Sequence, residues 1–366
     1  MTDVSRLKVE TVLKEIQDPY LQRDLVSGGE VKDIQVDDAG RVRVQLCLGY
    51  PAAGWHEALK AQVQERLSAI DGVDEVAVEV EVQTRIVPHA VQSSLKPLPG
   101  IRNIIAVASG KGGVGKSTTA VNLALALAAD GARVGILDAD IYGPSQPRML
   151  GIHGKPETRD GKTMEPLEGH GLQAMSIGFL IEEDTPMIWR GPMVTQALEQ
   201  LLRETNWREL DYLVIDLPPG TGDTQLTLAQ KIPVSGAVII TTPQDIALSD
   251  ARKGLKMFEK VDVPVLGVVE NMSIYICPQC GHEEYLFGQG GGERMAEECG
   301  AEFLGALPLD IGIREQADGG NPTVAADPEG RVAELYRDIA RRTAARLALQ
   351  ARDYSDRFPN IVVEND

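Results

Sequence analysis

Three early stretches of the chain, 31–36, 42–48 and 75–83, predict strands, and hydrophobic and polar residues alternate one by one in the last two. That period is typical of a strand with one buried face. Over Ser5–Ile16 and Trp55–Ile70 the hydrophobic residues recur at helical spacing, which predicts two helices. The pattern favours a small α/β domain in residues 1–91, with both helices on one face of its sheet.

The stretch 92–100, which reads QSSLKPLPG, breaks every periodicity and predicts a linker. From Ile101 onward, short apolar runs alternate with helical patterns. Such alternation predicts an α/β fold with a doubly wound, mainly parallel sheet, whose ligands bind at the carboxyl ends of the strands. We assign residues 101–350 to this second domain and 351–366 to a C-terminal tail. The predicted strands are 104–108, 133–137, 212–215, 237–241, 265–269 and 303–306.

No part of the chain predicts a membrane partner. No apolar stretch is long enough to span a bilayer, and residues 1–6 lead into a charged helical pattern rather than the apolar core of a signal peptide. A basic amphipathic helix can lie on a membrane surface, but we expect the apolar stripe over 332–347 to dock on the sheet. We therefore expect a cytoplasmic protein.

The charge limits the partners further. The 54 acidic and 36 basic residues give a formal charge of −18, which argues against a nucleic-acid partner because neutralising phosphates requires clustered Lys and Arg. In a cytoplasmic protein, four cysteines with one C-x-x-C pair favour metal or cluster binding over a disulfide framework.

A glycine-rich loop follows the strand predicted at 104–108, and it fits the phosphate-binding pattern G-x-x-x-x-G-K-[ST]. Its glycines let successive N–H groups face a phosphate, and a helix beginning near Lys116 adds the positive end of its dipole. We expect Lys116 between the β and γ phosphates and the Ser117 hydroxyl on Mg²⁺. The residues predicted to bind ATP are Gly110, Lys111, Gly112, Gly113, Val114, Gly115, Lys116, Ser117 and Thr118.

Acidic residues end two more of the predicted strands. Asp138 and Asp140 follow one of them, and we expect Asp140 to orient a water for attack on the γ-phosphate. Asp216 ends the other strand and suits Mg²⁺ held through water, while the loop 217–223 could sense the γ-phosphate. Acids at strand ends also serve as turn residues or helix caps. No glutamate follows Asp216, where many ATPases place a general base, so we expect slow hydrolysis.

Cys277 and Cys280 form the C-x-x-C pair. A tight turn with Pro278 inside brings both sulfurs to one side, so that they can bind one metal. A closed site needs four ligands, and a two-fold dimer would supply this pair twice, which points to an iron–sulfur cluster or a zinc ion between subunits. A redox-active dithiol and a local zinc turn remain alternatives. We expect Cys47 and Cys299 to pack as small apolar residues.

The glycine-rich run at 289–292 predicts a mobile surface loop beyond the cysteine pair. Such a loop would suit a site that must release what it holds.

The second lysine of the phosphate loop, Lys111, carries a family resemblance. With it the loop resembles the deviant Walker A group of P-loop NTPases, which includes MinD, ParA, the nitrogenase iron protein and the Mrp-type carriers. In that group this lysine reaches the partner subunit's nucleotide. The resemblance therefore implies a homodimer in which Lys111, with Lys116 and Asp140, acts in catalysis.

The segments 110–118, 138–145, 216–223, 270–281 and 308–315 together resemble the Mrp/ApbC family of iron–sulfur cluster carrier ATPases. Residues 16–31 resemble the small iron–sulfur assembly domain that bacterial members carry before the ATPase. The resemblance implies a homodimer that holds a labile [4Fe–4S] cluster through Cys277 and Cys280, receives it from a donor, and passes it to apo-proteins. It also implies that Asn271 reads adenine and that the segment after Pro308 completes that pocket.

Two other functions remain open at this point. One is a MinD- or ParA-like switch that positions a membrane or DNA complex; the cysteine pair and the lack of a basic patch speak against it. The other is an ATPase bridged by structural zinc, because the same thiolates bind zinc and iron.

Overall fold

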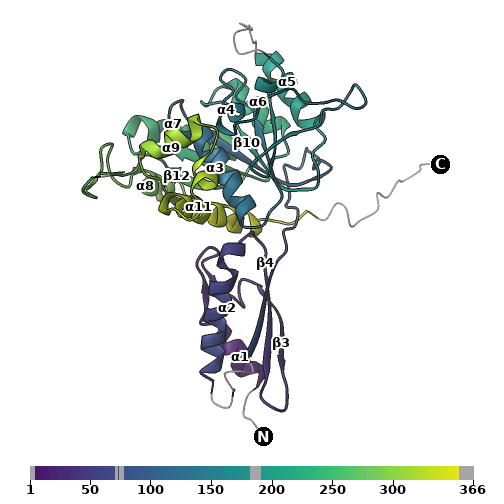
Figure 1. Cartoon of the computed structure of the whole chain (residues 1–366), viewed down its shortest axis with the longest axis vertical. Helices are drawn as coiled ribbons and strands as arrows, with labels where there is room; N and C mark the ends of the chain where they lie inside the picture. Colours follow the sequence, from purple (N-terminus) through teal and green to yellow (C-terminus); the bar gives the residue numbers. More distant parts are fainter. Residues whose placement is uncertain (1–4, 71–72, 74–77, 182–190, 278, 354–366) are drawn as a thin grey trace, which may run out of the picture.

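The computed structural model describes residues 5–70, 73, 78–181, 191–277 and 279–353. Figure 1 shows them as a smaller N-terminal unit, here residues 5–91, standing end-on against a larger unit, here residues 101–348. The predicted tail lies outside the described residues from Tyr354 onward.

The N-terminal unit is a three-stranded sheet in the order β3-β4-β5, with β3 antiparallel and β5 parallel to β4. Alternate side chains of β4 are buried, as the pattern predicted, and α1 and α2 lie on the same side of the sheet (Figure 1). The strand predicted at 75–83 is described from Val78 onward, and 75–77 lie outside the described residues. The elements are α1 Arg6–Leu13, β1 Gln17–Asp18, β2 Arg23–Asp24, β3 Val31–Val36, β4 Val42–Leu48, α2 Ala53–Ser68 and β5 Val78–Thr84.

The larger unit is built on an eight-stranded sheet in the order β15-β12-β11-β6-β10-β7-β9-β8. All its neighbouring strands are parallel except β8 and β9, which confirms the doubly wound, mainly parallel fold. The sequence analysis missed β8 and β9, a short edge hairpin turned at His170 and Gly171, because neither strand forms a long apolar run. The strands are β6 Ile101–Ser109, β7 Val134–Asp138, β8 Leu167–Gly169, β9 Leu172–Ser176, β10 Leu210–Asp216, β11 Gly236–Thr241, β12 Val265–Glu270 and β15 Phe303–Ala306.

Helices flank this sheet, and a small hairpin projects from it. The apolar stripe of α11 packs against α3, β12 and β15, which confirms docking on the sheet. No helix among the described residues is long and apolar enough to cross a membrane. The elements are α3 Lys116–Ala129, α4 Gln146–Met149, η2 Ile177–Phe179, α5 Gly191–Arg203, α6 Asp223–Lys231, α7 Asp245–Lys260, the hairpin β13 Tyr275–Ile276 and β14 Glu283–Glu284, α8 Gly291–Glu298, α9 Ile311–Asp318, α10 Thr323–Ala326 and α11 Arg331–Ala348.

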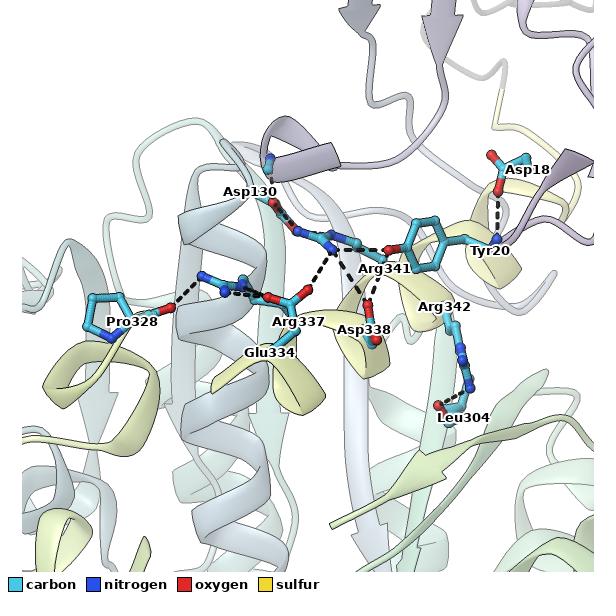
Figure 2. A network of polar contacts seen from close by, with 11 residues as sticks. Asp18, Tyr20, Asp130, Leu304, Pro328, Glu334, Arg337, Asp338, Arg341 and Arg342 are labelled. Carbon is cyan, nitrogen blue, oxygen red and sulfur yellow. Dashed lines mark hydrogen bonds and ion pairs between the residues drawn. The ribbon is translucent and has the colours of Figure 1, made fainter. Parts of the chain in front are cut away.

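The two units meet at a buried arginine on α11, shown in Figure 2. The Arg341 guanidinium donates to both carboxylate oxygens of Asp130, at 2.7 and 3.1 Å, and Asp130 caps the C-terminal end of α3. From the N-terminal unit, the Tyr20 hydroxyl accepts from Arg341 at 3.0 Å and the Gly54 N–H donates to Asp130 at 2.9 Å. A Cβ at Gly54 would lie 2.7 Å from the guanidinium, so a larger residue there would displace the Arg341 side chain.

Arg341→Met is expected to lower the free energy of unfolding by about 3 kcal/mol, because it leaves the buried Asp130 carboxylate without its counter-ion. Urea unfolding followed by circular dichroism measures this. The control is Arg314→Met, since the Arg314 side chain is 62% exposed and its surface ion pairs contribute under about 1 kcal/mol. An equal loss of unfolding free energy in the two variants would show that the buried ion pair contributes little to stability.

A buried carboxyl pair lies inside the N-terminal unit. Asp18 is fully buried and accepts from the Tyr20 and Leu21 N–H groups, at 2.6 and 2.8 Å, and from the Tyr50 hydroxyl at 2.5 Å. Glu30 is 2% exposed. Burial, reinforced by the Asp18 carboxylate, raises the pKa of Glu30 to about 9, so at neutral pH Glu30 is a neutral acid.

Glu30→Gln is expected to stabilise the protein at alkaline pH. The folded pKa of Glu30 lies above its unfolded value, so the folded chain keeps a proton that the unfolded chain releases, and stability falls as the pH rises from 4.5 to about 9. Glutamine has no proton to release, so at pH 8 the gain should be about 2 to 4 kcal/mol. Thermal unfolding from pH 5 to 9 measures it, with Glu79→Gln on the exposed side of β5 as the control. A pH profile parallel to that of the wild type would contradict the prediction.

Candidate nucleotide and cysteine site

The predicted phosphate loop joins β6 to α3, and close contacts require glycine at two of its positions, Gly110 and Gly115. Gly115 caps α3 with a φ of +81°, and a Cβ there would lie 2.1 Å from the Asn271 amide nitrogen. A Cβ at Gly110 would lie 2.2 Å from the backbone carbonyl carbon of Asp250 on α7. The loop therefore folds tightly against two other segments, and α3 begins at Lys116 as the sequence predicted.

Lys116 and Asp216 form a buried ion pair at the centre of the site. The Lys116 ammonium donates to the Asp216 carboxylate and lies 3.2 Å from the Ser117 hydroxyl oxygen. The other Asp216 oxygen accepts from the Gln146 side-chain amide at 2.9 Å. The three residues expected at the phosphates and Mg²⁺ thus lie together.

The two acids at the end of β7, Asp138 and Asp140, have different surroundings. Asp138 is fully buried and accepts from the Ser145 and Gln146 N–H groups at 2.9 and 3.0 Å, so it organises the turn into α4. Burial, followed by the neighbouring Asp216, raises the pKa of Asp138 to about 7. Asp140 is only half-buried, and burial raises its pKa while the Lys116 ammonium opposes the shift. Asp140 is therefore the better placed of the two to meet a water.

The loop 217–223 is tied to the phosphate loop. The Gly220 N–H donates to the Ser109 carbonyl at 2.9 Å, and the Ser109 hydroxyl donates to the Lys111 carbonyl at 2.9 Å. Lys111 is half-buried and, among the described residues, its ammonium has no ion-pair partner. Thr118 is half-buried and Gly112 and Gly113 are exposed, so the outer side of the loop is open.

Asn271 and Pro308 lie at one corner of the site. The Asn271 side chain is 7% exposed, and its NH₂ group donates to the Val114 carbonyl of the phosphate loop at 2.9 Å. The chain around Pro308 runs beside the end of β12 and the residues after it, because the Leu307 N–H donates to the Glu270 carbonyl at 2.9 Å and the Leu309 N–H to the Ile274 carbonyl at 2.8 Å. The structure thus places Asn271 on the phosphate loop, which already uses one of its amide hydrogens, and the Pro308 segment beside the residues that follow Asn271.

Cys277 and Cys280 lie in the turn between β13 and β14. The Cys277 N–H donates to the His282 carbonyl, and the Gly281 N–H donates to the Cys277 carbonyl, both at 2.9 Å. The Cys280 N–H, more than that of Gln279, lowers the pKa of the Cys277 thiol. Cys280 is exposed, and Pro278 lies outside the described residues.

No other ligands join this pair. Among the described residues, no group of three or more His, Cys, Asp or Glu side chains could hold a metal ion. Cys47 is half-buried on β4, and Cys299 packs against the core at the end of α8. One chain therefore presents two thiols in an exposed turn and cannot by itself close a four-ligand site from the part described.

The prediction of a surface loop at 289–292 was wrong for the glycines, since only Gln289 lies exposed outside the helix. Gly290 caps α8 with a φ of +63°, and Gly291 and Gly292 are buried in the first turn of the helix. The Gly292 N–H donates to the Glu270 carboxylate at 2.5 Å. Only glycine fits, since a Cβ at Gly292 would lie 2.9 Å from the Glu270 Cβ. Two further residues of this region, Glu270 and Gln146, were not predicted from the sequence. Glu270 could have been, because it is an acidic residue at the end of a strand, like Asp138 on β7 and Asp216 on β10.

Comparison with known protein families matches almost the whole chain. A family model described as "NUBPL iron-transfer P-loop NTPase" matches residues 100–344, and one described as "Iron-sulfur cluster assembly protein" matches residues 6–80. An iron-sulfur cluster carrier protein of Escherichia coli is 51% identical, over 94% of this chain and 93% of the relative. One of Pseudomonas fragi is 60% identical, over 76% of this chain and 97% of the relative.

A solved structure has a similar larger unit. It is a nucleotide-binding protein from Archaeoglobus fulgidus in complex with ADP, with a TM-score of 0.56 and 40% sequence identity, covering 63% of this chain and 90% of that one.

Proposed function

Because this chain belongs to the family of NUBPL-type iron-transfer P-loop NTPases, we propose that it binds a labile [4Fe–4S] cluster between two copies of itself and transfers the cluster to apo-proteins, with slow ATP hydrolysis. The observation that carries the proposal is the exposed turn holding Cys277 and Cys280. Along the chain, this turn follows β12 and precedes the segment after Pro308. Asn271, the residue directly after β12, contacts the phosphate loop.

The cluster would be held by Cys277 and Cys280 of both copies. Two thiolates from each chain make the four ligands that a cubane cluster or a tetrahedral zinc ion requires. The lowered pKa of Cys277 favours the thiolate, which is the form that binds metal. Because the turn is exposed, a recipient protein can approach the cluster, as transfer requires.

ATP would be bound by residues 110–118, with adenine between Asn271 and the segment after Pro308. The residues present fit Mg²⁺: the Ser117 hydroxyl and the Asp216 carboxylate are oxygen donors of the kind this ion prefers, and they lie beside the lysine expected at the phosphates. Bound Mg²⁺ would neutralise the charge that develops on the phosphates. Asp140 would orient the attacking water, and Lys111 would reach the phosphates of the partner copy.

For the N-terminal region we propose residues 1–91 as a domain that recruits donors or recipients, joined by the linker 92–100 to an ATPase domain over 101–350, with 351–366 as a tail. The N-terminal domain matches an iron–sulfur assembly family, and it contacts the end of α3 that is far from the phosphate loop. Both observations support a role in partner binding rather than in ATP hydrolysis.

The decisive experiment is iron, sulfide and zinc analysis of wild-type protein purified and reconstituted without oxygen, with the mass of the loaded species. About four irons and four sulfides per dimer, passed to an apo-ferredoxin with recovery of that protein's spectrum, is the expected result. Stoichiometric zinc that iron does not displace would favour the zinc-bridged ATPase instead, and a metal-free monomer that hydrolyses ATP would leave only a nucleotide switch.

A further inference from the structure

Gln146 is a buried side chain at the centre of the nucleotide site that the functions assigned so far do not use. It begins α4, directly after the turn that Asp138 organises, and is only 1% exposed. Its side-chain NH₂ group donates to the Asp216 carboxylate at 2.9 Å and to the Ser117 carbonyl at 3.1 Å. One amide therefore connects the end of β10 to the first turn of α3.

The other end of this amide is not used. The Gln146 carbonyl oxygen Oε1 is buried, and among the described residues it has no hydrogen-bond partner; the same is true of the neighbouring Ser145 hydroxyl. An unpaired buried acceptor costs about 1 to 3 kcal/mol, so a hydrogen-bond donor that enters this site is bound more favourably.

The orientation of the amide is fixed by its neighbours. A flipped side chain would place Oε1 against the Asp216 carboxylate and the Ser117 carbonyl, both of which only accept hydrogen bonds. The NH₂ group must therefore face them, and Oε1 is left to accept from something else. The hydration waters of Mg²⁺ are suitable donors, since this ion keeps several waters when bound to proteins.

We propose that Gln146 is a positioning residue for the nucleotide-bound Mg²⁺: its NH₂ group orients Asp216, and its carbonyl oxygen accepts a hydrogen bond from a water bound to the ion. The inference rests on the proposed ATP and Mg²⁺ site. If Gln146 only stabilised the fold, its NH₂ contacts would be enough, and the buried, unpaired Oε1 atom would have no role.

The test measures metal affinity directly. Mn²⁺ serves as the probe, and its dissociation constant in the ADP complex is measured by electron paramagnetic resonance for wild type, Gln146→Met and Gln146→Asn. Both variants are expected to weaken Mn²⁺ binding about 10-fold, the usual cost of losing a group that orients a metal ligand. ADP affinity in EDTA should stay within about twofold, because the contacts that hold the phosphates remain.

Gln92→Met is the matched control. Gln92 is also a buried glutamine, 7% exposed, whose amide donates to the Ala229 carbonyl at 2.8 Å and whose carbonyl oxygen is likewise unpaired among the described residues. It should lose stability without losing Mn²⁺ affinity. Unchanged Mn²⁺ binding in both Gln146 variants, an equal loss in Gln92→Met, or an equal loss of ADP affinity in EDTA would overturn the inference. Failure of wild type to bind ADP would instead contradict the nucleotide site itself.

Discussion

Replacing Cys277 and Cys280 together by alanine is expected to remove nearly all the iron and sulfide that the wild-type protein takes up on anaerobic reconstitution. The described part of one chain places no third metal-binding side chain with this pair, so the double variant has nothing left to hold a cluster. ATP hydrolysis without a cluster should stay within about twofold of wild type, because neither cysteine belongs to the phosphate loop. Iron and sulfide analysis with the visible spectrum measures the loss.

The chain offers a matched control in its other two cysteines. Cys47→Ala with Cys299→Ala removes the same number of thiols, both half-buried within their own units, and should leave iron and sulfide uptake unchanged. If the Cys277 and Cys280 variant kept its iron, or if the control variant lost it, the assignment of the cluster to the exposed turn would be wrong.

Lys111→Ala is expected to lower the rate of ATP hydrolysis by about 10² to 10³, the usual cost of removing a charge that stabilises the transition state. ADP binding should fall only a few-fold, because Lys116 and the glycines of the loop remain. The control is Lys155→Ala, another lysine that follows a glycine but is exposed outside the site. Steady-state hydrolysis and ADP titration separate the two effects.

Mixing variants tests whether Lys111 acts across the dimer. In a mixed dimer of Lys111→Ala and Asp140→Asn subunits, the site with intact Asp140 receives Lys111 from the partner, so activity should reappear although each variant alone is inactive. A lysine that served its own nucleotide would give no recovery on mixing, and the proposed cross-subunit role would have to be abandoned.

The central strands of the larger unit could be predicted because strands buried on both faces require continuous apolar runs. β6, β7 and β10 carry such runs, and the phosphate loop fixes the strand and helix on its two sides. The hairpin of β8 and β9 could not be predicted in this way, since Glu168 and Gln173 interrupt its two short strands and leave no continuous apolar run. The first turn of α8 was predicted as a loop because glycine lowers helix propensity, but here the glycines are needed for contact with Glu270.

The sequence predicted several residues that lie at the site, but it did not predict how buried each one is or what it contacts. Asp138 and Asp140 differ by two positions, yet one is enclosed by backbone N–H groups and the other borders the site. The burial of an acid at a strand end depends on how the following turn folds. No local sequence pattern predicts the conformation of that turn. Gln146 could not be found for the same reason: it belongs to no motif, and its contacts join α4 to β10 and α3.

The contacts of Arg341 bear on how such a two-part protein could arise. Its acidic partners, Asp130, Glu334 and Asp338, all belong to the larger unit. From the described residues of the N-terminal unit, the hydrogen bonds to this ion pair come from neutral groups, the Tyr20 hydroxyl and the Gly54 N–H. Removing that unit would admit water to an ion pair that is already complete, without stranding a charge. The two parts could therefore have been fused, or encoded as separate chains, with little change to the surface where they meet.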